Sequence, residues 1–289
     1  GVEAMRRLLP VMQQLTLRRD LSWRTQGLSG NQLKSAIAEA NASSKLVLKD
    51  WHILPAEVQE LVQFSERASS LNRQIEELPP DLLEVTPQEW HRRHQSALEE
   101  ATKVCSDLAN LSNLILDPDL DAIYLTLAVF TRLPELHDDL GALGECLEGN
   151  DGTTRPSRML ATQLSGLHAR LKRAQERIDN DLKTAHQHSH VIDAQLLAEI
   201  HRHQQQWQEL HQHLDRWVNQ PSLVDTDDIR AMLQSASVSS ESAFRLMSIS
   251  CSALDQALVI RLERLRANQR LLLGGTAVCL LLIGYLIVG

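Results

Sequence analysis

The distribution of glycine restricts what this chain can fold into. None of the 12 glycines falls between Gly30 and Gly141, or between Gly166 and Gly274. Compact sheets turn about every 8–12 residues and commonly place glycine at left-handed positions of those turns. Only 3 % of the residues are aromatic, although strands favour aromatic side chains. The sequence therefore predicts an all-α fold of long helices and excludes β-sandwich, β-barrel and Rossmann-type folds.

The C-terminal residues 271–289 form an uncharged apolar segment. As a helix this segment is about 28 Å long, close to the hydrocarbon thickness of a bilayer. We therefore expect a transmembrane helix here, in contact with the lipid bilayer. No helix-breaking residue lies between Asp228 and Gly274, so the same helix is expected to run from about residue 226 to the end.

Capping residues and prolines divide the rest of the chain. Thr86-Pro87-Gln88-Glu89 is a capping box, and Asp117-Pro118 repeats that logic. Residues 149–156 are the most loop-like stretch. The expected helices cover residues 2–27, 31–77 with a bend near Pro55, 87–115, 118–147, 156–219 and 226–289. We expect two stacked helical-bundle modules: a membrane-distal module (1–148), a linker (149–155), a membrane-proximal module (156–265) and the transmembrane helix (271–289).

Apolar residues recur three and four positions apart in these helices, which is typical of helical bundles and coiled coils. One such stripe runs along residues 229–258 and ends at Leu258. It offers a seam for a second copy of the chain. The sequence therefore predicts a homodimer that can be cross-linked through cysteines at Leu254 or Leu258.

Several function classes are disfavoured by composition and motifs. The net charge of −8 disfavours nucleic acid as a partner. The four cysteines contain no C-x-x-C pair, so neither a disulfide framework nor a cysteine zinc site is expected. Nucleophile elbows, P-loops and glycine-rich dinucleotide turns are also missing from the sequence. We expect a protein that is not an enzyme and uses no cofactor.

Histidines are abundant between residues 186 and 213. His186 and His190 share a helix face at i, i+4, a spacing that allows metal binding. They are weak metal candidates, because the interleaved Gln and Glu residues also fit a solvated polar face.

A candidate ligand site begins at Arg18 and Arg19, which lie within one helical turn of Ser22 and Trp23 among apolar positions. The planar fork of arginine suits a carboxylate or an oxyanion, so a small anion is the predicted ligand class. Replacing Arg19 by Ala is then expected to weaken binding without unfolding the domain. The alternative is a structural ion pair with an acid of a neighbouring helix.

Two further candidates lie on the helix that follows the Asp117-Pro118 corner. Helix capping accounts for Asp117, but it does not account for Tyr124 and Arg132, which follow it on this helix. They complete the predicted ligand site if their helix faces the first one.

Two runs of this chain resemble a known family. N-L-I-L-D-P-D-L-D-x-x-Y-L (residues 113–125) and R-L-P-E-L (132–136) resemble the extracytoplasmic sensor region of bacterial transmembrane receptors. These receptors are methyl-accepting chemotaxis receptors, sensor kinases of two-component systems and diguanylate cyclases. The stretch 262–289, a charged helix entering an apolar span, is similar to their second membrane helix.

The opening of the chain is similar to the L-Q-x-E-R-G-x-S motif of nitrate- and nitrite-sensing-like helical domains. Leu15, Arg19 and Ser22 fit this motif. Three positions depart from it, because Thr16, Arg18 and Asp20 replace Gln, Glu and Gly.

The resemblance implies a ligand-sensing input region for signal transduction. Its bulk would lie in the periplasm at the bacterial inner membrane, and it would relay a small displacement of the last helix across the membrane. A first membrane helix would precede Gly1, and HAMP-type and output modules would follow Gly289. The partner would be a small anionic ligand or a periplasmic binding protein.

An opposing observation favours a different function. Arg261, Arg264, Arg266 and Arg270 lie on the bundle side of the apolar span, where the positive-inside tendency expects cytoplasm. Taken alone, this favours a tail-anchored cytosolic coiled-coil or spectrin-like scaffold protein.

Overall fold

The computed structural model describes residues 2–24, 34–35, 37–38, 62–112, 114, 119–147, 158–189, 192–220 and 226–288. These described residues form helices and contain no strand, which confirms the all-α fold class. A short 3₁₀ turn (Leu82–Glu84) precedes the helix that begins at Pro87. A π-helical turn (Ala128–Arg132) joins the helix that ends at Leu127 to the helix that begins at Leu133. The α-helices are α1 (Val2–Arg24), α4 (Val62–Glu76), α5 (Pro87–Leu111), α6 (Leu120–Leu127), α7 (Leu133–Leu147), α8 (Arg158–His188), α9 (Ala194–Asn219) and α10 (Thr226–Val288).

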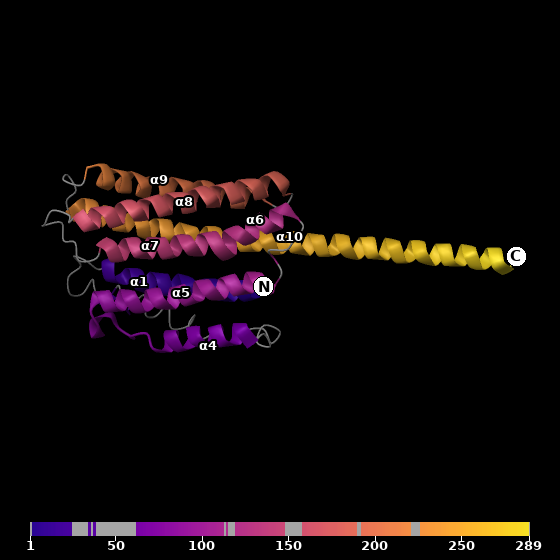
Figure 1. The fold of residues 1–289 in the computed structure, drawn as a ribbon, viewed down its shortest axis with the longest axis horizontal. Coiled ribbons are helices and arrows are strands. Elements are labelled where there is room, and N and C mark those ends of the chain that lie inside the picture. The colour runs from indigo at the N-terminus through magenta and orange to yellow at the C-terminus, as the bar shows by residue number, and fades with distance from the viewer. Residues whose placement is uncertain are drawn as a thin grey trace.

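The helices lie side by side along one axis (Figure 1). Helices on both sides of residues 149–155 contribute to one continuous hydrophobic core, and α8 packs directly on α6 and α7. This side-by-side bundle differs from the stacked arrangement of two modules that the sequence led us to expect. The segment chosen as the linker, 149–155, lies outside the described residues.

The prediction of a single helix over residues 156–219 is wrong. The chain leaves the helical conformation after His188, and a new helix begins at Ala194. Asp193 caps the new helix, because its carboxylate accepts a hydrogen bond from the Leu196 amide at 2.9 Å. The second helix then runs back along the first, and this reversal explains why α8 and α9 lie beside the other helices.

The expected helix start at residue 87 is confirmed, whereas this helix, α5, ends at Leu111 and not at residue 115. Thr86 is the N-cap of α5, with its hydroxyl accepting from the Glu89 amide at 3.2 Å. Of the helix expected over 31–77, residues 34–35, 37–38 and 62–77 are described, and the bend near Pro55 lies outside them. Asp117 lies outside them as well, and the N-cap of α6 is Asp119.

Pro134 disturbs its helix without ending it. Proline has no amide hydrogen to donate to the carbonyl four residues back, so an α-helix is locally disrupted there. The π-helical turn Ala128–Arg132 comes immediately before this position, and α7 continues to Leu147. Turns of this kind are common at kinks and at functional sites.

The long helix α10 has two parts. Up to Leu254 its apolar stripe is buried within the chain's own bundle, against α1, α7 and α9. Leu254 itself is fully buried. The prediction of a dimer seam through this residue is therefore wrong, because the chain's own helices already cover its side chain. Leu258 is the last stripe residue in contact with the core.

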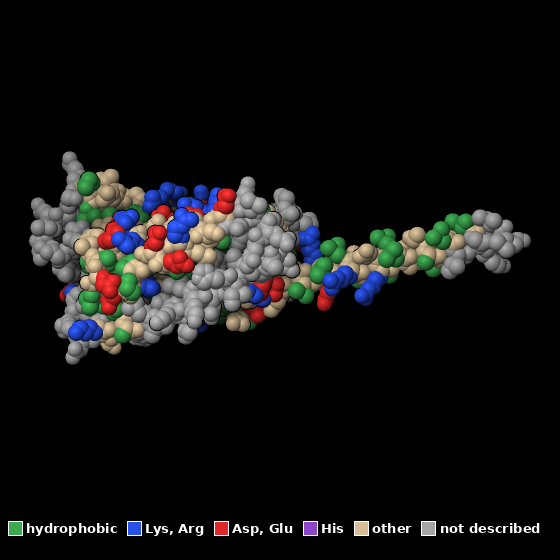
Figure 2. Space-filling model, turned by 90° about the horizontal axis from the view of Figure 1, so that it is seen from below, with side chains coloured by type: hydrophobic (Ala, Val, Ile, Leu, Met, Phe, Trp, Pro, Cys, Tyr) green, Lys and Arg blue, Asp and Glu red, His purple; other side chains and the backbone are tan. Residues whose placement is uncertain are grey.

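Beyond Arg261, whose Nε is 3.8 Å from Oδ2 of Asp119, the helix α10 projects from the bundle (Figure 1). Figure 2 shows basic side chains on α10 close to the bundle and apolar side chains farther along it. The apolar residues from Leu271 onward are more than half exposed where the structure describes their side chains. By length and composition, α10 is the one described helix that is able to cross a membrane.

Candidate functional site

Arg19 joins three helices near the end of the bundle that is farthest from the projecting part of α10. Its guanidinium is fully buried. Nε donates to Oδ1 of Asp20 at 2.8 Å, and Nη1 donates to Oε1 of Gln95 on α5 at 2.9 Å. Nη1 also donates to the backbone carbonyl of His137 on α7 at 3.2 Å. The anionic partner of Arg19 is therefore the adjacent residue Asp20, and the ion pair lies within α1.

Two glycines of α7 make room for this arrangement. A Cβ atom at Gly141 would lie 2.3 Å from Nη1 of Arg19, and one at Gly144 would lie 1.0 Å from Cζ3 of Trp23. Only residues without a side chain allow Arg19 and Trp23 to press against α7 so closely. Sequence reasoning missed both glycines, although their spacing of three places them on one face of the helix.

Arg18 points to the other side of α1, toward the proline segment that precedes α5. Its Nη2 donates to the carbonyl of Pro79 at 2.7 Å, and its guanidinium lies 5.0 Å from the ring centre of Trp90. The indole of Trp90 in turn donates to the Arg18 carbonyl. Burial lowers the pKa of Arg18 to about 10, so the side chain stays charged at neutral pH. Its role here is to hold the start of α5 against α1.

Buried histidines surround these two arginines. Burial, together with the charge of Arg19, lowers the pKa of His91 to about 3. Burial and the charge of Arg18 lower the pKa of His94 to about 3, and burial lowers the pKa of His137 well below its usual value. All three rings are neutral at pH 7. Sequence reasoning looked for histidines between 186 and 213 and missed these three.

Several buried polar side-chain atoms in this region have no hydrogen-bond partner among the described residues. They include Nη2 of Arg19 and Nε1 of Trp23, which are N–H donors, and both ring nitrogens of His91, one of which carries the proton of the neutral ring. Trp23 lies between the other two, with its ring 5.4 Å from that of His91 and 5.5 Å from Cζ of Arg19. Buried polar groups are normally hydrogen-bonded, and a cationic fork beside neutral N–H groups suits a small oxyanion. We call Arg19, Trp23 and His91 the donor cluster.

The structure brings together four of the six predicted ligand-binding residues. Arg18, Arg19, Ser22 and Trp23 lie in the last two turns of α1, where the Ser22 hydroxyl donates to the Arg19 carbonyl at 3.1 Å. Arg132 instead faces α8, with Nε 3.4 Å from Oδ2 of Asp181.

Tyr124 is placed away from the other five residues. It is half-buried on α6, near the end of the bundle where α10 leaves (Figure 1). Arg132, which pairs with Asp181 of α8, and Tyr124 of α6 are therefore not part of the donor cluster.

The predicted metal pair is only partly within the described residues. His186 is exposed on the last turn of α8, and His190 lies outside the described residues. A different group, His168, His211 and Asp215, brings three potential metal ligands within 4.8 Å of one another.

Comparison of the chain with known protein families, with curated proteins and with solved structures finds no match.

Proposed function

We propose that this chain is the ligand-sensing input region of a bacterial transmembrane receptor, and that it binds and relays without catalysing a reaction. The supporting observation is the helix α10, Thr226–Val288, which is uninterrupted from the core of the bundle to its apolar end. An unbroken helix transmits a displacement of one end to the other end. A transmembrane receptor needs such a connection between its ligand site and the membrane.

The start of α1 lies where α10 leaves the bundle, which fits this proposal. Nη2 of Arg6 is 3.0 Å from Oδ2 of Asp255 on α10, and Figure 1 shows the start of α1 at the pole of the bundle from which α10 projects. A membrane helix joined to the beginning of α1 would therefore enter the bilayer next to α10. Two adjacent membrane helices at one pole are the arrangement expected of a receptor ectodomain.

Direct contacts lead from the donor cluster to α10. Arg19 donates to the carbonyl of His137, and Nδ1 of His137 lies 3.1 Å from the hydroxyl of Ser240 on α10. The His137 ring also stacks on Phe244 of α10, with centroids 3.7 Å apart. In the proposed mechanism, an anion on the donor cluster favours one position of Arg19 and α7. The position of α10 shifts with it, as in other two-state switches.

Removal of the indole donor of Trp23 tests the ligand part of the proposal. Trp23→Phe removes the indole donor and keeps an aromatic ring, and a hydrogen bond to a charged partner contributes about 1.5–3 kcal/mol. We therefore expect the variant to bind the ligand about ten- to a hundredfold more weakly than wild type. The measurement is the thermal shift of the full chain in detergent, titrated with nitrate, nitrite, acetate and phosphate.

Trp217→Phe is the matched control for this experiment. Trp217 is also buried, and its indole nitrogen likewise has no partner among the described residues, but it lies on α9. We expect its binding curve to equal that of wild type. If none of the four anions stabilises wild type, the donor cluster is not a small-anion site. Equal affinity of Trp23→Phe and wild type would remove the indole from the site.

The orientation of the chain separates the two candidate functions. Arg264, Arg266 and Arg270 lie on the bundle side of the apolar segment and are exposed, an arrangement that favours a tail-anchored cytosolic scaffold. Long translocated domains largely override this charge bias, and we therefore expect the bundle to be periplasmic. A reporter that is active only in the periplasm, fused near Gly149, should then be active. Activity of a cytoplasm-only reporter at that site would contradict the receptor and support the scaffold.

We also propose that the receptor is a homodimer whose contact lies beyond the bundle. Leu262 and Leu265 are 47 % and 54 % exposed and continue the stripe of Leu258. Cysteines at these two positions should form disulfides between subunits in membranes, whereas a cysteine at Glu263 should not. Equal cross-linking at all three positions would argue against a seam on this face.

A further inference from the structure

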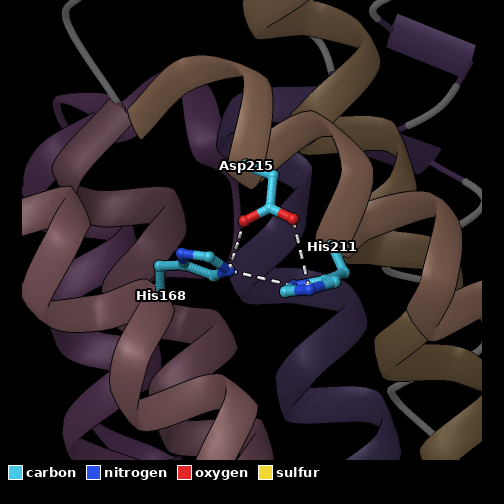
Figure 3. Close-up of side chains that lie close together, drawn as sticks. All are labelled: His168, His211 and Asp215. Carbon is cyan, nitrogen blue, oxygen red and sulfur yellow. Dashed lines mark hydrogen bonds and ion pairs between the residues drawn. The ribbon is translucent and has the colours of Figure 1, made fainter. Parts of the chain in front are cut away.

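Two histidines and an aspartate meet between α8 and α9. Figure 3 shows His168 of α8 facing His211 and Asp215 of α9. Nε2 of His168 is 2.9 Å from Nδ1 of His211 and 3.4 Å from Oδ1 of Asp215. Nε2 of His211 is 3.3 Å from Oδ2 of Asp215. His211 and Asp215 are at i, i+4, so one face of α9 supplies both of them.

The three side chains lie close enough together to bind one tetrahedral metal ion. Zinc binds imidazole nitrogen and carboxylate oxygen at about 2.0–2.2 Å, so neighbouring ligand atoms of a tetrahedral site are about 3.3 Å apart. The 3.4 Å between Nε2 of His168 and Oδ1 of Asp215 is close to such an edge. His211 offers one of its two ring nitrogens, and one ligand atom from each of the three residues lies within 4.8 Å of the others. We propose that His168, His211 and Asp215 bind a divalent transition metal of the zinc type, with the fourth position left for a water molecule or an external ligand.

The surroundings suit an ion that enters from solvent. The side chains of His168, His211 and Asp215 are 13 %, 27 % and 49 % exposed, so the group lies at the surface and is partly shielded. The ring of Trp207 stacks on that of His211, with an interplanar angle of 17°. This contact restricts the orientation of the imidazole, as supporting groups commonly do around metal ligands.

The metal would join α8 and α9, which pack on each other less extensively than each packs on other helices of the bundle. α9 packs mainly on α10, and its contact with α8 is less extensive. Ligands from both helices would therefore tie α8 to α9. A bound ion stabilises the folded state by mass action, because the unfolded chain does not bring His168 near the other two ligands.

Zinc binding by the full chain, without an affinity tag and in detergent, tests this proposal. Wild type is expected to bind Zn²⁺ in competition with a chromogenic chelator. Replacing supporting groups around a metal commonly costs about 10–100-fold in affinity, so removal of a direct ligand in His168→Ala should cost at least about a hundredfold. Asp215→Asn, which keeps the shape of the side chain, should also weaken binding. In addition, Zn²⁺ should raise the melting temperature of wild type and leave that of His168→Ala unchanged.

The remaining histidines are controlled for in two ways. His213→Ala, two residues from His211 on the same helix, should bind Zn²⁺ like wild type. Co²⁺ should give the intense visible absorption of a four-coordinate site in wild type and lose it in His168→Ala. The proposal is overturned if wild type does not compete with the chelator, if His168→Ala and Asp215→Asn both bind like wild type, or if Co²⁺ shows only the weak six-coordinate spectrum.

Discussion

Lowering the pH from 7 to 5 is expected to reduce the free energy of unfolding of the bundle by about 5 kcal/mol. Four buried histidines, His91, His94, His137 and His203, cause this effect. Burial lowers the pKa of His91 and of His94 to about 3 and that of His203 to about 4. Burial also holds the pKa of His137 well below its usual value.

The direction follows from proton binding. In the unfolded chain a histidine has a pKa near 6.5, so at pH 5 it is protonated while the buried rings remain neutral. The unfolded state then binds more protons, and stability falls as the pH falls from about 6.5 toward 3. Each histidine contributes slightly less than about 2 kcal/mol between pH 7 and pH 5, and the four together contribute about 7 kcal/mol.

Asp138 opposes this trend in part. Burial raises the pKa of its carboxyl to about 7, although the charge of Arg19 lowers it. In this case the folded state binds the extra proton, so the contribution of Asp138 to stability increases as the pH falls from about 7 toward 4. It offsets about 2 kcal/mol of the histidine effect, and the net loss from these five groups is about 5 kcal/mol.

Urea unfolding followed by tryptophan fluorescence at a series of pH values measures this effect. His91→Leu is the informative variant. Neither ring nitrogen of His91 has a partner among the described residues. The substitution therefore deletes the titrating group without breaking a hydrogen bond to any of them. It should flatten the pH dependence by about one quarter of the histidine effect. His201→Leu, at an exposed position of α9, should leave the slope unchanged. A stability that does not vary between pH 7 and 5 would show that these rings are hydrated.

Arg19→Ala is expected to destabilise the fold by about 3–5 kcal/mol. The substitution removes the positive charge from beside Asp20, whose side chain is only 2 % exposed. It also removes the two hydrogen bonds from Nη1 to Gln95 and to His137. The sequence alone suggested that this change would weaken ligand binding and leave the fold intact. The complete burial of Arg19 favours the structural ion pair as the larger effect.

The same unfolding measurement, made at pH 7, checks this prediction. Arg92→Ala is the control, because Arg92 is 65 % exposed and pairs with Glu89 on the surface of α5; exposed pairs contribute about 0–1 kcal/mol. The double variant Arg19→Met/Asp20→Leu removes both charges and should recover much of the loss. If Arg19→Ala is as stable as wild type, the ion pair has no structural role.

Local sequence signals predicted the elements whose ends depend on neighbouring residues. The Thr86 cap, the long α10 and the buried stripe of α8 all follow from spacing and capping chemistry. The break between α8 and α9 was missed because no proline or glycine marks it. Its one local sign is Asp193, whose capping role becomes clear only when the chain reverses and α9 packs on α10.

The part of the candidate site that lies on a single helix was predictable from the sequence. Arg18, Arg19, Ser22 and Trp23 are close in sequence, and one helix keeps them together. His91 and the glycines Gly141 and Gly144 join them only through packing between α1, α5 and α7. Long-range contacts of this kind leave no periodic pattern in a single sequence. For the same reason His168 could not be connected to His211 and Asp215.

The continuity of α10 fixes the angular phase between the bundle and the apolar segment. Each residue of an α-helix adds about 100° of rotation and 1.5 Å of rise. One residue inserted between Leu258 and Leu271 would therefore turn the apolar segment by about 100° against the bundle. Seven inserted residues would bring its faces back to within about 20°. The direction in which each face of the apolar segment points is thus set by a count of residues in the exposed part of α10.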